Sequence, residues 1–324
     1  MNVMKKYKPK NIEDFDFDED YKNNLKKFIN NDFMNIVIVG ENGTGKTSLL
    51  NSMIDNYLSI ILSNVSDIEN IESNYVFRIN NLKDCGITFY RNEVKNFCQF
   101  PSKQKKLLVV DNLEMVDKSI QAIFKYYMEK WGQNFYFIAT TSNSHKINES
   151  LLAKTYQLVL PKKSYDVIKS IFNNICCSQK ICVTDEAKEY IIAHCNGKIK
   201  ILFMFLQKIC YLNEKITLKL IENNFTMLSH NEFKQFFEAC KNRKYKNAFE
   251  SINNFLSKGY SICDIFDEMF GFVKIQENNT IFNEIMKYEI IKLISKSTLI
   301  LNTIHEENIE LYFFTNKLAN LLNE

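Results

Sequence analysis

The sequence contains little glycine and proline, with 8 and 3 of these residues in 324. Few turn-forming residues allow few tight hairpins, which argues against an all-β sandwich or barrel and favours a helix-rich chain. The chain also has no apolar run of about 18 residues, the length that a membrane-spanning helix needs. Its first residues lack the apolar segment of a signal peptide. We therefore expect a soluble intracellular protein with no membrane partner.

The nine cysteines are scattered and include no CxxC pair. This argues against a zinc ribbon or a disulfide scaffold and suits a reducing compartment. The 41 basic and 38 acidic residues give a net charge of only +3. Because there is no global positive field, any contact with nucleic acid must come from a local basic surface. Length and an apolar content of 46% indicate a globular chain of two or three domains.

Buried-strand patterns alternate with amphipathic helical stretches over the first 160 residues. Runs of four or five apolar residues are typical of strands that are covered on both faces, as in a parallel sheet. The runs are 36–39, 76–79, 107–110, 135–139 and 156–160. Between them, segments such as 119–130 have helical periodicity. This pattern predicts an α/β fold with a doubly wound parallel sheet.

The strand pattern stops at Pro161. Residues 161–225 have the pattern of short helices, one of which ends where Gly197 suits a left-handed C-terminal cap. From residue 226 onward the helical pattern is longer, with apolar stripes that include Ile290 and Leu318. We therefore expect three domains, 1–160, 161–225 and 226–324.

A glycine-rich segment follows the first strand and precedes an apolar-striped helix. It matches the GxxxxGK[ST] pattern, in which backbone N–H groups and a helix N-terminus surround phosphates. In this pattern the lysine reaches the β- and γ-phosphates and the threonine hydroxyl ligates magnesium. The residues expected to bind ATP are Gly40, Glu41, Asn42, Gly43, Thr44, Gly45, Lys46, Thr47 and Ser48.

An acidic residue at the end of a neighbouring strand is expected to hold Mg²⁺ through water, together with Thr47. Asp111 follows the apolar run 107–110 and fits this role. Asn112 stands where hydrolysing proteins of this class carry a catalytic glutamate, and an amide orients water but cannot take its proton. Glu114 is a candidate substitute for that glutamate, although a helix-capping role is equally compatible with its position.

These motifs occur in an order that resembles the small subunits of the replication factor C clamp loader, which belong to the AAA+ family. Lys6–Lys10 resembles the family's KYRPK segment, and 111–114 occupies the place of its DEAD box. The remaining similar segments are 81–97, 137–152, 197–207, 259–261 and the closing helix. The resemblance implies an AAA+ P-loop core, a small helical lid, an all-helical collar and assembly into a pentamer.

The resemblance also assigns roles to single residues. Tyr7, Lys8 and Pro9 would wrap the adenine, and Lys200 would be the sensor 2 residue. Lys154 would occupy the place of the arginine finger that reaches a neighbouring subunit's ATP. The sensor 1 position is either Ser142 or Asn143.

Several positions depart from the family pattern. Lysine replaces arginine at 8, 154 and 200, and Asn112 replaces the catalytic glutamate. An arginine finger can raise the hydrolysis rate by about 10³–10⁵, and lysine keeps its charge but lacks the planar fork that binds two oxygens. We expect a subunit that binds ATP and Mg²⁺ and hydrolyses ATP weakly or not at all.

Thr88, Arg91 and Lys95 share one face of a helix after Gly86 if the helix is regular. The resemblance implies that this face follows the backbone of primer–template DNA, although a solvated helix face is the simpler alternative. Phe97 and Phe100 are candidates for contact with a sliding clamp, or for core positions. The expected location is the nucleus, or a cytoplasmic replication compartment if the protein is viral.

Two other functions fit the motifs. One is a self-sufficient AAA+ ATPase of the replication-initiator or helicase-loader type, with Glu114 as its base. The other is an interaction module in which nucleotide is a permanent structural cofactor.

Overall fold

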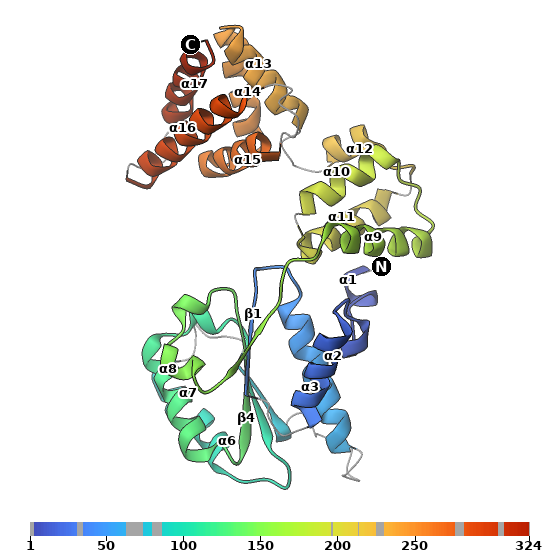
Figure 1. The fold of residues 1–324 in the computed structure, drawn as a ribbon, viewed down its shortest axis with the longest axis vertical. Coiled ribbons are helices and arrows are strands. Elements are labelled where there is room, and N and C mark those ends of the chain that lie inside the picture. The colour runs from blue at the N-terminus through green and yellow to red at the C-terminus, as the bar shows by residue number, and fades with distance from the viewer. Residues whose placement is uncertain are drawn as a thin grey trace. The chain divides into compact units, whose positions relative to one another are not determined.

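The computed structural model describes most of the chain, in nine ranges. These are residues 3–30, 35–62, 74–79, 86–195, 197–212, 214–224, 230–275, 282–303 and 308–323. The chain divides into two compact units, Met1–Ile216 and Thr217–Glu324 (Figure 1). Every helix within the covered ranges is too short or too polar to cross a membrane.

A five-stranded parallel sheet forms the centre of the first unit, and the expected α/β fold is confirmed. Its strand order is β2-β3-β4-β1-β5, so two pairs of neighbouring strands, β4 with β1 and β1 with β5, are not consecutive in sequence. The strands are β1 (Ile36–Val39), β2 (Val76–Ile79), β3 (Lys106–Val110), β4 (Phe135–Thr141) and β5 (Tyr156–Val159). All five coincide with the apolar runs of the sequence to within two residues.

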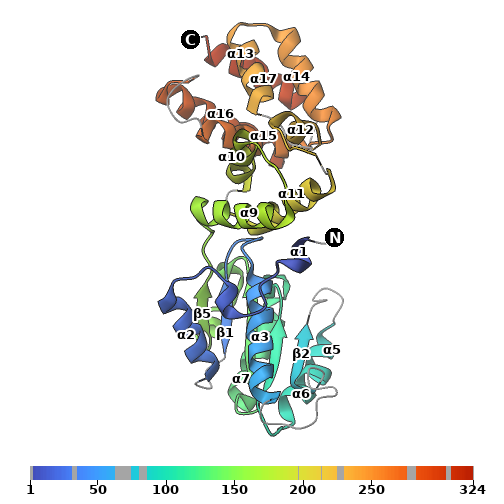
Figure 2. The same cartoon turned by 90° about the vertical axis from the view of Figure 1, so that its right-hand side faces the viewer.

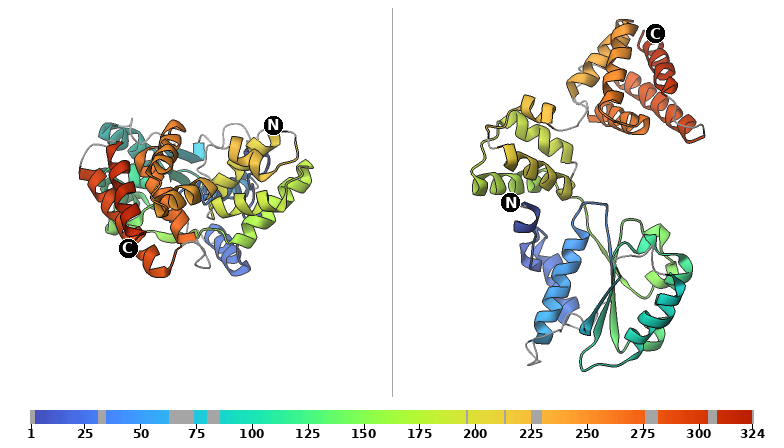
Figure 3. Two further views of the ribbon diagram at one scale, coloured as in Figure 1. Left: turned by 90° about the horizontal axis from the view of Figure 1, so that it is seen from above. Right: turned by 180° about the vertical axis from the view of Figure 1, so that it is seen from behind.

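Alternate residues of each central strand enter two separate hydrophobic cores. Ile36 and Ile38 belong to the core under α3, whereas Val37 belongs to the core under α7. Helices α2 and α3 cover one face of the sheet and α6, α7 and α8 cover the other (Figure 1; Figure 3, right), and α3 faces the viewer in Figure 2. A sheet that is buried on both faces explains why its strands are continuously apolar.

The helices around the sheet follow the expected periodicity, with one irregular segment. They are α1 (Val3–Lys6), η1 (Ile12–Asp14), α2 (Glu19–Asn30), α3 (Lys46–Leu62), α5 (Ile87–Phe89), α6 (Lys95–Gln99), η3 (Leu113–Met115), α7 (Lys118–Trp131), η4 (Ser144–Lys146) and α8 (Glu149–Leu152). Between α5 and α6 the chain forms a five-residue π-helical segment, η2 (Tyr90–Val94). Such a segment widens the turn and shifts the helical register.

Helices α9 (Tyr165–Gln179), α10 (Asp185–Cys195) and α11 (Ile199–Leu212) complete the first unit. The Ser164 hydroxyl caps α9 by accepting a hydrogen bond from the Val167 amide. Gly197 follows α10 with φ = +74°, a left-handed conformation that favours glycine. A side chain at Gly197 would also place its Cβ 2.8 Å from the Lys163 carbonyl oxygen. The glycine is therefore needed both for its conformation and for close packing.

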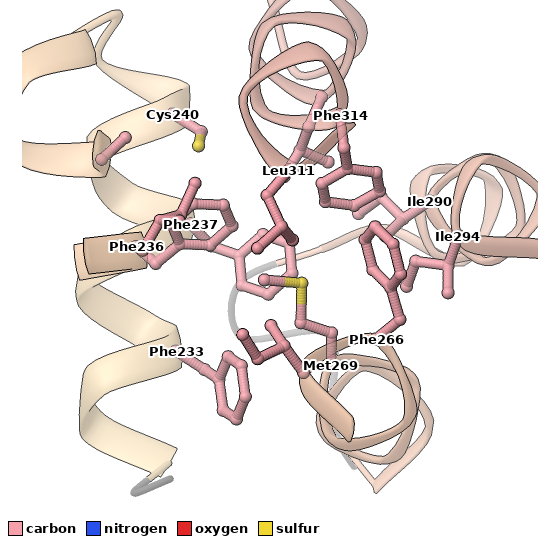
Figure 4. Packing of buried hydrophobic residues seen from close by; sticks show 14 of the residues in the cluster. Phe233, Phe236, Phe237, Cys240, Phe266, Met269, Ile290, Ile294, Leu311 and Phe314 are labelled. Carbon is pink, nitrogen blue, oxygen red and sulfur yellow. The ribbon is translucent and has the colours of Figure 1, made fainter. Parts of the chain in front are cut away.

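The second unit is wholly helical over the residues that are described. It contains α12 (Leu218–Asn224), α13 (His230–Lys241), α14 (Tyr245–Ser257), α15 (Ile262–Ile275), α16 (Glu284–Thr303) and α17 (Ile309–Leu321). Its core is rich in phenylalanine, with Phe237 stacked on Phe272 at a ring separation of 5.6 Å. Figure 4 shows residues of three helices that meet in this core: Phe237 of α13, Phe266 and Met269 of α15, and Leu311 of α17.

The division into three domains stays a prediction. The last strand ends at Val159 and helices follow, as the expected 160/161 boundary requires. The other expected boundary, 225/226, lies outside the described residues.

Candidate nucleotide-binding site

The glycine-rich loop connects β1 to α3, where parallel α/β sheets commonly bind ligands. Gly43 and Gly45 adopt φ values of +87° and +105°, which side chains other than glycine rarely tolerate. A Cβ at Gly40 would lie 2.7 Å from the Leu160 carbonyl oxygen, so this position also requires glycine. Packing thus requires glycine at Gly40, and the backbone conformation requires it at Gly45. At Gly43 both the conformation and the packing favour glycine.

Lys46 is nearly buried, with 6% of its surface exposed, at the first residue of α3. Its Nζ donates hydrogen bonds to the carbonyl oxygens of Gly40 at 2.7 Å and Glu41 at 2.9 Å. Burial lowers the pKa of Lys46, and the nearby carboxylates of Glu114 and Asp111 partly oppose that shift. The ammonium group is therefore held inside the loop, where a phosphate group would meet it.

The remaining loop side chains differ in exposure. Asn42 and Thr47 are exposed, and Ser48 is half-buried. Thr44 is buried, and its hydroxyl donates a 2.9 Å hydrogen bond to the Glu41 carbonyl oxygen. This bond stabilises the turn of the loop ahead of Lys46.

Asp111, directly after β3, meets the loop as the sequence predicts. The Thr47 hydroxyl donates to Asp111 Oδ2 at 3.2 Å. The other carboxylate oxygen accepts a hydrogen bond from the Thr140 hydroxyl, and Thr140 in turn accepts one from the Asn112 amide at 3.0 Å. A hydroxyl and a carboxylate at this distance are a donor set suited to Mg²⁺.

Thr140 was not singled out from the sequence, although it is fully buried next to Asp111. A signal was present, because Thr140 and Thr141 are polar residues in a strand whose other members are apolar or aromatic. Buried hydroxyls need partners, and Thr140 finds one in Asp111.

Asn112 occupies the left-handed region, with φ = 58° and ψ = 57°, and its side chain is exposed. Asparagine adopts this conformation more easily than glutamate does. The local backbone therefore accommodates the residue that stands in place of the catalytic glutamate.

Glu114 lies beside the end of β4. Its Oε1 accepts hydrogen bonds from the Ser142 hydroxyl at 2.6 Å and the Ser142 amide at 3.1 Å. Burial raises the pKa of Glu114, but hydrogen bonds that include those from Ser142 and Thr141 outweigh it, and the pKa is lowered overall. The carboxylate is thus ionised at neutral pH, and its charge acts on Lys46 of the nucleotide loop, which favours a site role over helix capping.

The same contacts distinguish the two sensor 1 candidates. Ser142 binds Glu114, whose charge acts on Lys46. Asn143 is exposed, and its side-chain oxygen caps η4 by accepting a 3.0 Å hydrogen bond from the His145 amide. The geometry therefore favours Ser142.

Lys200 meets the loop at the start of α11. Its backbone N–H donates a 3.1 Å hydrogen bond to the Gly43 carbonyl oxygen. A Cβ at Gly43 would lie 3.2 Å from the Lys200 Cβ and 3.6 Å from the Lys198 Cβ. The loop and the first turn of α11 are consequently in direct contact, and Lys198 is a second lysine beside Gly43.

Tyr7 follows α1 and is fixed by the end of α9. Gln179 donates a 2.7 Å hydrogen bond to the Tyr7 hydroxyl, which also bonds Ser178. These bonds, that to Ser178 foremost, lower the pKa of Tyr7. Lys8 is exposed and Pro9 half-buried. The segment expected to wrap adenine is therefore tied to the helices after the sheet.

Lys154 lies away from these contacts, just after α8. Its Nζ is 3.7 Å from the carboxylate of Glu129 on α7, and both side chains are about half exposed. Lys154 is therefore an exposed lysine in an ion pair, and its role as a residue that reaches a neighbouring subunit stays a prediction.

The expected DNA face is exposed, but it is less regular than the sequence suggests. Thr88, Arg91 and Lys95 are all exposed, and the π-helical segment Tyr90–Val94 lies between the first and the last of them. The spacing of an ideal α-helix therefore does not hold along this face. The matching stretch begins at residue 81, and its first five residues lie outside the described ranges.

Of the two candidate clamp contacts, only Phe100 is well exposed, at 62%. Phe97 packs against Phe77 at a ring separation of 5.1 Å, and the ammonium group of Lys106 lies over its ring. Phe97 is thus partly buried and packs against the core under α7, which favours the core alternative for this residue.

Two family models match the chain. Residues 32–161 match the AAA domain, and residues 229–313 match the replication factor C C-terminal domain. The first match covers the sheet and the loop, and the second lies in the helical second unit.

Curated relatives match along most of their length. A replication factor C small subunit of Acanthamoeba polyphaga mimivirus is 22% identical over 91% of this chain and 89% of its own. Replication factor C subunit 3 of Saccharomyces cerevisiae is 22% identical over 87% of this chain and 82% of its own. Among solved structures, a Thermotoga maritima RuvB variant has a TM-score of 0.52 at 14% identity, covering 72% of this chain and 78% of that chain.

Proposed function

Because the chain is a divergent replication factor C small subunit of the AAA+ family, we propose that it is an ATP-binding subunit of a DNA sliding-clamp loader. In this role it helps to load the clamp at primer–template junctions during DNA replication. The observation that carries the proposal is the order of an AAA domain and a replication factor C C-terminal domain on one chain. The C-terminal match favours this role over that of an initiator or helicase-loader ATPase.

The loop residues provide the binding chemistry for ATP. Lys46 and the inward-turned amides around Gly43 and Gly45 bind the phosphates. Thr47 and Asp111 would hold Mg²⁺, which would supply positive charge to the phosphate oxygens. Tyr7, Lys8 and Pro9 would hold the base, and Lys200 and Ser142 would act on the phosphates.

The contact between Lys200 and Gly43 connects the loop to α11. A nucleotide bound in this loop would interact with residues on both sides of this hydrogen bond. Its presence or absence would therefore set the position of the lid helices α9, α10 and α11. Nucleotide then acts as a switch for assembly with neighbouring clamp-loader subunits, in a pentamer. The exposed Thr88, Arg91 and Lys95 would contact the DNA backbone within that assembly.

Hydrolysis by this subunit is expected to be weak. Asn112 cannot accept a proton, and Lys154 lacks the bidentate geometry of an arginine finger. In the assembled loader, other subunits would supply most of the turnover. The site of action is the nucleus, or a viral replication compartment in the cytoplasm.

Replacing Glu114 with glutamine tests the rival in which Glu114 is the working base. We expect the isolated chain to show negligible ATP turnover before and after the change, and its ATP affinity to vary less than about threefold because Ser142 can also donate to an amide oxygen. Phosphate release in the presence of Mg²⁺ measures the turnover. A matched control is Glu149→Gln, at an exposed position on α8. Brisk phosphate release by the unmodified chain, lost about 10²–10⁴-fold in Glu114→Gln alone, would establish the rival instead.

A further inference from the structure

An ion pair joins the nucleotide loop to the segment between β5 and α9. Lys162 Nζ donates to Glu41 Oε1 at 2.8 Å, and the two side chains are 40% and 54% exposed. Glu41 follows the first glycine of the loop, and Lys162 lies between the end of β5 at Val159 and the start of α9 at Tyr165. The pair therefore connects the loop to residues 160–164, the segment that leads from β5 into α9. We call this segment the hinge.

Glu41 is a negative charge in a loop built to bind an anion. Its backbone carbonyl accepts a hydrogen bond from Lys46, so the residue is part of the same turn. The hydrogen bond from Lys162 lowers the pKa of Glu41, burial opposes that shift, and the charges of Lys162, Lys198 and Lys46 add to the lowering. The carboxylate is consequently ionised at neutral pH, and without a partner it would repel the phosphates of a nucleotide.

The hinge has little freedom to move independently of the helices that follow. The Lys163 amide donates to the Gly197 carbonyl oxygen at 3.3 Å, and the Lys200 amide donates to the Gly43 carbonyl oxygen at 3.1 Å. A Cβ at Gly197 would lie 2.9 Å from the Cβ of Lys162. A shift of α10 and α11 relative to the loop would therefore act on Lys162 through these contacts.

We propose that Glu41 and Lys162 form a charge pair that sets the affinity of the loop for nucleoside triphosphate and makes that affinity depend on the position of the lid helices. Lys162 neutralises Glu41 when the lid is in the position of this structure. When the lid moves, Glu41 is uncovered and opposes the phosphates. This inference rests on the proposed ATP binding. It gives Glu41, already expected in the loop, a specific role, and it adds Lys162 to the site.

A double-mutant cycle tests the pair directly. Binding of Mg²⁺ with AMP-PNP, and separately with ADP, is measured by isothermal titration calorimetry for the full chain and for Glu41→Gln, Lys162→Met and the double variant. We expect Lys162→Met to weaken AMP-PNP binding about fivefold and Glu41→Gln to strengthen it about threefold, with smaller changes for ADP. In the Glu41→Gln background, Lys162→Met should change the affinity less than about 1.5-fold, because no carboxylate remains to be neutralised.

Lys169→Met, at an exposed lysine on α9, is the matched control and should leave affinity unchanged. Both members of the pair are exposed, and surface ion pairs contribute little to folding, so the thermal midpoints should also stay unchanged. Equal weakening by Lys162→Met in both backgrounds would overturn the pair, because Lys162 would then act on the nucleotide itself. An unchanged affinity in Lys162→Met would overturn it as well. If the unmodified chain bound neither AMP-PNP nor ADP, both the proposed function and the proposed charge pair would fail.

Discussion

Replacing Lys46 with alanine should reduce the affinity for ATP by about 100-fold, which corresponds to about 2.8 kcal/mol. Lys46 supplies a charged donor at a nearly buried position, and its Nζ is held by the carbonyl oxygens of Gly40 and Glu41. Charge-assisted hydrogen bonds to phosphate are strong when water is largely excluded. Lys46 is the single lysine of the loop 40–48, so no second loop lysine can replace its contact with the phosphates.

Calorimetric titration with Mg²⁺ and AMP-PNP measures the loss. Lys118→Ala, at an exposed lysine on α7, is the control and should bind as the unmodified chain does. The thermal midpoint of Lys46→Ala should fall by only a few degrees if nucleotide is an exchangeable ligand and not a permanent structural cofactor. An affinity within threefold of the unmodified chain would contradict the assignment of the loop. A large loss of stability without nucleotide effects on assembly would instead support a structural cofactor.

Replacing Phe237 with alanine should lower the stability of the second unit by about 3–5 kcal/mol. Phe237 is 1% exposed and contacts three aromatic rings, those of Phe236, Phe272 and Phe282, at centroid separations of 5.5, 5.6 and 5.0 Å. Removing the ring leaves a cavity that surrounding helices cannot fill completely. Because residues 229–313 of this unit match the replication factor C C-terminal domain, we expect the proposed assembly to weaken as well.

The single tryptophan makes the effect measurable in the full chain. Trp131 lies in the first unit, so its fluorescence follows the unfolding of that unit, whereas far-UV circular dichroism follows both. In urea, Phe237→Ala should shift the circular dichroism transition to lower concentration and leave the fluorescence transition in place. Phe313→Ala is the control, since Phe313 is 52% exposed, and it should change stability by less than about 0.5 kcal/mol. Equal shifts for the two variants would contradict the description of this core.

The strands could be predicted from sequence because a sheet covered on both faces leaves an unbroken apolar run in each strand. The run 36–39 is one example, and its residues alternate between the two cores. The π-helical segment Tyr90–Val94 could not be predicted, since its composition is compatible with an ordinary α-helix. Its irregularity depends on packing, for instance on the burial of Tyr90 and Val94.

The local parts of the site were predictable, and its long-range contacts were not. Gly43, Gly45 and Lys46 lie in one contiguous motif whose geometry follows from glycine's conformational freedom. Thr140 and Lys162 reach the site from β4 and from the hinge, so only the folded sheet brings them close to Asp111 and Glu41. The choice between Ser142 and Asn143 likewise depended on which side chain turns toward Glu114.

The central claim is that nucleotide in the Gly40–Ser48 loop governs how this chain assembles beside related subunits. The most direct test is affinity purification of the tagged full chain from its native source, with Mg²⁺-ATP present or after nucleotide depletion. The account predicts that related AAA+ chains and a ring-shaped clamp accompany it with ATP, and that depletion or Lys46→Ala removes most of them. Recovery of the chain alone in the presence of ATP, or of the same partners without nucleotide, would contradict the account.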